Sequence, residues 1–324
     1  MKTIGTATFT ICLFILLSGS GNADSAAEIF EKSGTTGGLI VEVGFVDAAF
    51  TAELGKLDSI TVQTLARDPR HVSQARAALA ALGVYGKISV EQVAGQTLPY
   101  ADNLVNLFVV HGTLADCGIS RAELMRALTP GGVICSQVKV NESNAQRLQI
   151  DRKPWPSEID QWTHFLHAAD GNAVAADRRV APATALQWIV DPKYCRSHEI
   201  DSSLPAMVSA SGRLFYFLDE GPIGITDPRF PARWMLIARD AFNGVLLWKR
   251  PINSWGWPAW SNQPLPKGRS NGGRFTQPLQ VGRTMAGTAE RVYVTLGYGA
   301  AVSALDAKTG ALLATYADTA GCDE

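Results

Sequence analysis

The first half of the chain alternates short apolar runs with helix-like segments. The apolar runs predict strands at residues 39–43, 59–65, 87–92, 104–110 and 132–138. The central runs are apolar throughout, which is typical of parallel strands that are covered on both faces. Because helices are expected between these strands, the pattern predicts a Rossmann-like, doubly wound α/β sheet.

Two of the expected helices carry clear start signals. Asp68 stands before a proline, as an N-cap acid before a first-turn proline does, and Gly83 is expected to end that helix. Ser120 and Glu123 have the spacing of a capping box, and the Pro-Gly-Gly run at 130–132 is expected to end the second helix.

Such a sheet binds ligands beyond the carboxyl ends of its strands, near the point where the strand order reverses. The candidate site therefore includes the segment from Glu42 to Ala48, the end of the second strand near Asp68, and His111 after the fourth strand. Asp68 also fits the role of a helix N-cap, and His111 that of a structural histidine. No general base or nucleophile stands out, so the catalytic residues stay unknown.

Four segments of this half stand in an order that resembles a known family. They are LIVEVGFVDAAFTAEL, LARDPRHVSQARAAL, LPYADNLVNLFVV and LMRALTPGGVI, within residues 36–140. The chain is similar here to the class I S-adenosylmethionine-dependent methyltransferases, especially the small-molecule type. The resemblance implies S-adenosylmethionine as cofactor. It also implies a set of cofactor-binding residues: Glu42, Gly44, Phe45, Asp68, Leu98 and His111.

Three positions depart from the family pattern. Val46 and Ala48 replace the second and third glycines of the loop, where side chains are expected to narrow the space for the ligand. Ala66 stands where the family has the acid that holds the ribose, so the ribose hydroxyls lose an acceptor. The chain is therefore expected to keep the fold of the cofactor site but to bind S-adenosylmethionine weakly or not at all.

The second half is rich in strand signals and contains an internal repeat. RLFYFL at 213–218 matches RVYVTL at 291–296, and the Asp-Ala-x-x-Gly run from Asp240 matches the one from Asp306. Each copy predicts a strand, a tight turn whose glycine takes a positive φ, and a second strand.

This repeat resembles the pyrroloquinoline-quinone-type β-propeller repeat, over about residues 183 to 317. The first copy keeps the motif's tryptophan at Trp248, whereas the second has Ala314 in its place. The resemblance implies an all-β region of incomplete propeller blades, as in large secreted bacterial proteins that join a methyltransferase-like domain to a propeller. The chain is accordingly expected to be the front part of a longer protein. Pyrroloquinoline quinone itself is not expected, because a complete propeller, a calcium site and a catalytic aspartate cannot be assembled.

The N-terminal segment has the pattern of a signal peptide at residues 1–23. Lys2 supplies the positive charge, residues 11–17 the apolar core, and small residues lead to a cleavage point after Ala23. The protein is thus expected to be exported to the periplasm or the extracellular space, with no membrane span after cleavage. The remaining boundaries are expected at 34–145 for the methyltransferase-like domain, 146–182 for a linker and 183–324 for the propeller repeats.

Charge, cysteines and histidines narrow the possible functions. A net charge of −1 gives no reason to expect nucleic acid as a partner. The cysteines at 117, 135, 195 and 322 lack the spacing of structural zinc and are expected to be buried. No metal site is expected from His164, His167 and Asp170, and the polar run at 198–201 fits loop hydrogen bonding. The tryptophans at 255, 257 and 260 fit either ligand stacking or packing between blades.

Three functions stay open at this stage. The first is methyl transfer to a small acceptor. The second is a non-catalytic, exported binding or scaffold protein, which takes a small molecule, a protein or a glycan on the propeller. The third, and least expected, is a quinone-dependent oxidoreductase.

Overall fold

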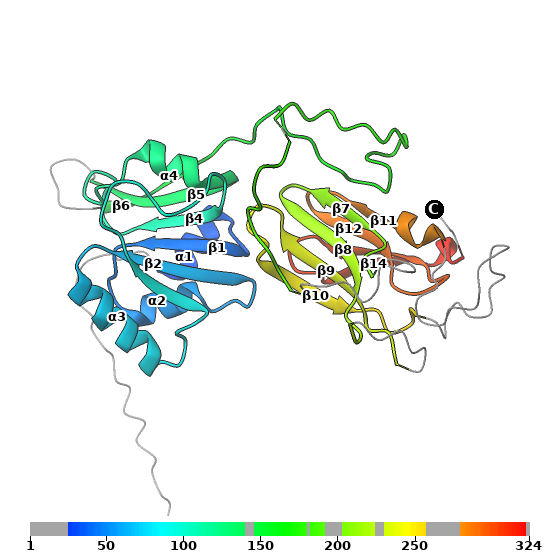
Figure 1. Ribbon diagram of the computed structural model, residues 1–324, viewed down its shortest axis with the longest axis horizontal. Coiled ribbons are helices and arrows are strands. Elements are labelled where there is room, and N and C mark those ends of the chain that lie inside the picture. Colours follow the sequence, from blue (N-terminus) through cyan, green and yellow to red (C-terminus); the bar gives the residue numbers. More distant parts are fainter. Residues whose placement is uncertain are drawn as a thin grey trace, which may run out of the picture.

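The structure is a computed structural model that describes residues 25–139, 146–179, 182–191, 203–223, 230–256 and 279–321. Figure 1 shows a part with helices around a sheet, followed along the chain by a part built from strands. The expectations for the signal peptide, for Cys195 and Cys322, for the run at 198–201 and for the tryptophans at 257 and 260 lie outside the described residues.

The first part is a six-stranded sheet with helices on both faces, in the strand order β3-β2-β1-β4-β5-β6. Its strands are β1 (Gly38–Val43), β2 (Ile60–Ala66), β3 (Ile88–Gln92), β4 (Val105–Val110), β5 (Leu128–Lys139) and β6 (Gln146–Arg152). The strands β1 to β5 are parallel and β6 is antiparallel to β5. The Rossmann-like, doubly wound α/β prediction is confirmed.

Four helices cover the sheet, and their apolar sides explain why the central strands are mostly apolar. They are α1 (Ala26–Ser33), α2 (Ala48–Leu54), α3 (Pro69–Ala81) and α4 (Arg121–Ala127). Ile29 of α1, Leu54 of α2 and Leu79 of α3 belong to the core on one face. Leu124 of α4 belongs to the core on the other face, so the central strands are buried from both sides.

Both helix start signals are confirmed, but one helix end is wrong. The Asp68 carboxylate accepts from the backbone N–H of Arg70, and the Ser120 hydroxyl accepts from that of Glu123. The Pro-Gly-Gly run at 130–132 lies inside β5, because α4 already ends at Ala127. Val105 and Leu107 of β4 are two positions apart, but their partners in β5, residues 128 and 133, are five positions apart. The extra β5 residues, which include the Pro-Gly-Gly run, therefore form a bulge in the strand.

The antiparallel strand β6 was not expected from the sequence. It occupies residues 146–152, where the sequence places the start of a linker. Leu148 and Ile150 alternate with polar residues, and both pack on the sheet core. Such a half-buried edge strand has no continuous apolar run to reveal it.

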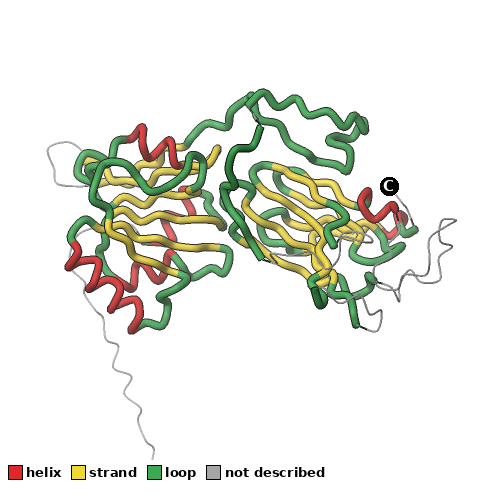
Figure 2. The backbone as a smooth tube through the Cα atoms, viewed as in Figure 1, coloured by secondary structure: helices red, strands yellow, loops and turns green. Residues whose placement is uncertain are grey.

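The second part consists of two four-stranded antiparallel sheets, as Figure 2 shows in yellow. The first sheet holds β7 (Met207–Ala210), β8 (Arg213–Asp219), β9 (Trp234–Asp240) and β10 (Leu246–Pro251). The second sheet holds β11 (Met285–Gly287), β12 (Arg291–Thr295), β13 (Val302–Asp306) and β14 (Leu312–Tyr316). Two short 3-10 helices, η2 (Leu279–Arg283) and η3 (Ala317–Thr319), flank the second sheet. One apolar core joins the sheets, through residues such as Phe215 and Val292.

The internal repeat appears as two identical tryptophan contacts. Trp188 Nε1 donates to the carbonyl of Ala241, and Trp248 Nε1 donates to that of Ala307, each at 3.1 Å. Gly244 and Gly310 have φ values of 73° and 70°. A Cβ atom would lie 2.5 Å from Trp188 at the first glycine and 2.7 Å from Trp248 at the second. Both the left-handed backbone and the close indole ring therefore require glycine at these turns.

Hydrogen bonds join the two parts of the chain. Asn106, in β4, donates from Nδ2 to Asp240 Oδ2 at 2.7 Å and accepts at Oδ1 from Asn243 Nδ2 at 2.7 Å. Its Oδ1 also accepts from the backbone N–H of Leu39, so the contact continues into β1. Burial raises the pKa of Asp240. In the part of the chain that the structure describes, no helix is long and apolar enough to cross a membrane.

Candidate functional site

The predicted ligand crevice lies where the carboxyl ends of β1 and β4 adjoin. The strand order reverses between these two strands, because β2 lies beyond β1 and β5 lies beyond β4. Gly44 follows β1 with a φ of 89°, and His111 follows β4. A Cβ atom at Gly44 would lie 3.6 Å from the His111 side chain, so the chain passes close to that histidine here.

Glu42 is fully buried and both of its carboxylate oxygens have partners inside the protein. Thr51 of α2 and Thr64 of β2 donate their hydroxyls to Oε2 at 2.8 and 2.6 Å. His111 Nε2 lies 2.7 Å from Oε1. The carboxylate thereby ties together β1, β2, α2 and the segment after β4, and its hydrogen bonds are used within the fold.

The space beside this network is small. A cavity of about 60 Å³ is lined by Asp47, Phe50, His111 and neighbouring residues. The Phe50 and His111 rings meet edge to face, with their centroids 5.1 Å apart. Small-molecule sites in proteins usually measure about 300–1,000 Å³, so this cavity is too small for a nucleoside cofactor.

Arg67 bridges the mouth of the crevice. It follows β2, and its Nη2 donates to the carbonyls of Cys117 and Gly118 at 3.2 and 3.0 Å. Because β1 lies between β2 and β4, this side chain spans the carboxyl end of β1. Gln92 of β3 holds the same residue by donating to the Arg67 carbonyl. The segment after β2 is thus fastened to the loop after β4.

The other predicted site residues have structural contacts. Asp68 accepts from the Arg70 backbone at 2.8 Å as the N-cap of α3. Leu98 is buried, and its backbone N–H donates to Glu123 Oε1 at 2.7 Å. Phe45 packs against the apolar core beneath the sheet. The structure therefore brings together Glu42, Gly44 and His111, and leaves Asp68 and Leu98 outside their network.

The loop expectation for Val46 stays a prediction. Val46 is 55% exposed, and it also lines the small cavity beside His111. Ala66 is nearly buried and supplies no acceptor at the end of β2, as the sequence indicates. Thr51 and Thr64 hold the Glu42 carboxylate, and Arg67 bonds to the loop after β4. The sequence signals none of these contacts, because β2 carries other polar residues besides the buried Thr64.

Taken together, the residues of this crevice do not fit S-adenosylmethionine. The candidate acid, Glu42, is bonded to three protein side chains, and the space beside it is too small. Opening the Glu42 network for a bound nucleoside would leave buried polar groups without partners.

Glu123 predicts a pH-dependent contribution to stability. Its hydrogen bonds with Arg126 lower its pKa to about 2, from an ordinary 4.5. A carboxyl whose pKa is lower in the folded state stabilises the fold above pH 4.5, and this contribution disappears as the pH falls toward about 2. The variant Glu123→Gln is expected to flatten this acid limb when urea unfolding is followed across that range. An acid limb as steep as in the wild type would contradict this role.

No protein-family model and no curated protein matches the sequence. Among solved structures, a candidate S-adenosyl-L-methionine-dependent methyltransferase from Methanococcus maripaludis is 22% identical, with a TM-score of 0.31, over 34% of this chain and 52% of that one. An S-adenosylmethionine-dependent O-methyltransferase from Thermotoga maritima is 15% identical, with a TM-score of 0.31, over 36% and 44%. Geranyl diphosphate C-methyltransferase from Streptomyces coelicolor, solved with S-adenosyl-L-homocysteine, is 12% identical, with a TM-score of 0.31, over 35% and 43%.

The chain spans about half the length of these structures or less. These three structures share a methyltransferase description, but the matches are distant and partial. The fold and the candidate sites of this chain are therefore described from its own strand order and side-chain contacts.

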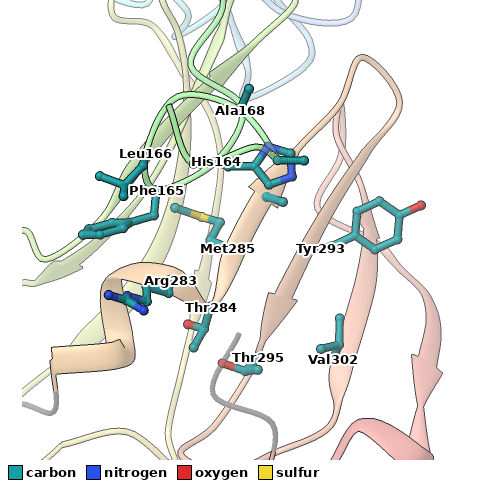
Figure 3. Close-up of a pocket in the computed structure, with 13 residues that line it drawn as sticks. His164, Phe165, Leu166, Ala168, Arg283, Thr284, Met285, Tyr293, Thr295 and Val302 are labelled. Carbon is teal, nitrogen blue, oxygen red and sulfur yellow. The ribbon is translucent and has the colours of Figure 1, made fainter. Parts of the chain in front are cut away.

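A larger cavity of about 460 Å³ lies in the second part (Figure 3). Its walls are the 164–171 loop, the end of η2 and strands β11, β12 and β13. The lining residues are His164, Phe165, Leu166, Ala168, Ala169, Gly171, Arg283, Thr284, Met285, Ala286, Tyr293, Thr295 and Val302. Sequence reasoning did not find this cavity, because its walls come from segments more than 100 residues apart.

The histidines and Trp255 have contacts of their own. His167 Nε2 lies 2.8 Å from Asp160 Oδ2, and His164 Nδ1 lies 2.8 Å from Thr163 Oγ1. Within the described ranges, no group of three histidine, cysteine or acidic residues could hold a metal ion. Trp255 is buried against Phe217, with ring centroids 4.3 Å apart, so it packs in the core and is not free to stack on a ligand.

Proposed function

We propose that this protein is a non-catalytic, exported binding protein. Its methyltransferase-like part serves as a scaffold that has lost the cofactor site, and its strand-rich part carries the ligand-binding surface. The observation that carries the proposal is the Glu42 network. A carboxylate that is fully buried and bonded to Thr51, Thr64 and His111 acts as a structural element of the fold.

The Arg67 bridge supports the same interpretation. A working Rossmann-like site keeps its crevice open and lined by glycine, so that the backbone can approach the ligand. Here Arg67, after β2, is bonded to Cys117 and Gly118 in the loop after β4, so the segments at the carboxyl ends of these strands are tied together. The loop after β1 is short, because helix α2 begins at Ala48 with Asp47 as its N-cap.

The strand-rich part is proposed to be a run of β-propeller blades. The repeated tryptophan contacts support this, because Trp188 and Trp248 pack in the same way on equivalent turns. The larger cavity lies against the second of these sheets, so a small molecule is the proposed partner. No basic surface is needed for this role, and the net charge of −1 fits it.

Calorimetric titration of the mature chain with S-adenosylmethionine tests the proposal. The expected result is no saturable heat, which corresponds to a dissociation constant weaker than about 1 mM. S-adenosylhomocysteine, titrated in parallel, is expected to behave in the same way. Saturable binding of either molecule in the micromolar range would show that the crevice opens, and the scaffold proposal would then be wrong.

A further inference from the structure

We propose that the 460 Å³ cavity binds an uncharged aromatic compound with an N–H or O–H group, and that this group donates a hydrogen bond to His164 Nε2. This inference rests on the proposed binding function and deepens it by naming the ligand class. The cavity lies between the 164–171 loop and the face of the second sheet (Figure 3).

The walls of the cavity suit a flat apolar body. Its volume lies within the range of about 300–1,000 Å³ that is usual for small-molecule sites. Figure 3 shows Phe165 and Leu166 on one side and Tyr293 and Val302 on the other. Met285 lies between these two sides, so an aromatic ring held there would contact side chains on both of its faces.

The contacts of His164 determine which of its ring nitrogens carries the hydrogen. The Thr163 hydroxyl donates to the carbonyl of His167 at 3.3 Å, so its one hydrogen is used. The same oxygen lies 2.8 Å from His164 Nδ1 and therefore accepts from an N–H at that position. In a neutral imidazole the other nitrogen, Nε2, then carries a lone pair and acts as an acceptor.

This acceptor is available to a ligand. His164 is half-buried and lines the cavity, and its Nε2 has no hydrogen-bond partner among the described residues. An N–H or O–H of a ligand would complete the hydrogen bonds of the ring. A ligand whose donor is blocked can fill the same space, but it leaves this nitrogen without a partner.

The rest of the lining favours a ligand without charge. Arg283 is exposed and lies 5.7 Å from the centre of the Phe165 ring, and it already has an interaction partner. It therefore gives no reason to expect an anion. No carboxylate is among the described lining residues, so a cation would find no partner there either. A neutral ligand enters such a cavity without leaving a charge unpaired.

The loop that forms one wall is held in place before any ligand arrives. The backbone of Thr163 bonds to His167 and to Gly287, at 2.8 and 2.9 Å, which fastens the loop to itself and to β11. A Cβ atom at position 282 would lie 2.9 Å from the Phe165 ring, so Gly282 allows this ring to take its place. A preformed wall reduces the entropy that a ligand must lose on binding.

Calorimetric titration of the mature chain with indole and with 1-methylindole tests the inference. Both compounds are flat, uncharged and close in size, but only indole has an N–H to donate. The wild type is expected to bind indole at least about fivefold more tightly, because the methylated ring leaves His164 Nε2 without a partner. This comparison uses the wild-type protein alone, so it does not depend on the folding of a variant.

Two variants locate the site. His164→Phe keeps a flat ring but removes the acceptor, and it is expected to bind indole and 1-methylindole equally well. Ala286→Phe, on β11, is expected to lose both ligands because the new ring fills the cavity. His71→Phe makes the same change on the exposed side of α3 in the other part, and this matched control is expected to bind like the wild type.

Four outcomes would overturn the inference. They are no indole binding by the folded wild type, equal affinity of the wild type for the two compounds, a preference for indole that persists in His164→Phe, or indole binding that survives Ala286→Phe. Near-ultraviolet circular dichroism checks that each variant is folded. Absence of indole binding together with absence of S-adenosylmethionine binding removes this inference alone, whereas binding of S-adenosylmethionine overturns the proposed function.

Discussion

Replacement of Trp248 by alanine is expected to lower the free energy of unfolding by about 3–5 kcal/mol, the usual range for a large buried aromatic residue. Trp248 is almost fully buried in the core that joins the two antiparallel sheets. Its ring covers Gly310 and lies near Phe215, and its Nε1 donates to the Ala307 carbonyl at 3.1 Å. The substitution therefore removes apolar contacts from both sheets and leaves a buried carbonyl without its donor. Urea unfolding followed by far-ultraviolet circular dichroism measures the change.

Trp155→Ala is the control for this substitution. Trp155 is 39% exposed and contacts Phe242 edge to face, so its loss is expected to cost much less than that of Trp248. Equal losses for the two variants would contradict the role of Trp248 as the residue that joins the sheets.

His111→Leu is expected to lower the free energy of unfolding by about 3 kcal/mol, because it removes one partner of a buried carboxylate. Glu42 Oε1 is bonded to His111 Nε2, and its other oxygen is already shared by two threonines. The leucine fills part of the space but cannot donate a hydrogen bond, so the carboxylate is left partly unsatisfied. Urea unfolding at neutral pH again gives the measurement.

A double variant separates this network from simple packing. Glu42→Leu with His111→Leu removes the carboxylate and its partner together, and is expected to be less destabilised than the sum of the two single variants. Strict additivity would mean that the two side chains do not act as a unit. The structural role assigned to Glu42 would then be wrong.

The parallel strands could be predicted because burial on both faces leaves a mostly apolar run in the sequence. The strands β1 and β4 are examples, and both begin and end close to the predicted bounds. The strand β6 was not predicted, because only Leu148 and Ile150 of its residues contact the core. The Pro-Gly-Gly run was assigned to a helix end, since a bulge within a strand uses the same residues.

The candidate site was predictable only in part. Glu42, Gly44 and His111 come together because the carboxyl ends of neighbouring parallel strands lie at one edge of the sheet. What fills the crevice depends on tertiary contacts, such as the bond from Arg67 to Gly118, which joins residues 51 positions apart. No local pattern encodes such a bond. The contact of Trp188 with Gly244 likewise joins a loop to a turn, and only its likeness to the Trp248 contact reveals the repeat.

A crystal structure of the mature chain, soaked in S-adenosylmethionine, tests the central claim most directly. The expected result is an unchanged crevice, in which Glu42 stays bonded to Thr51, Thr64 and His111 and Arg67 stays bonded to Gly118. Cofactor density between the ends of β1 and β4, with Arg67 displaced, would contradict the claim that this domain is a closed scaffold.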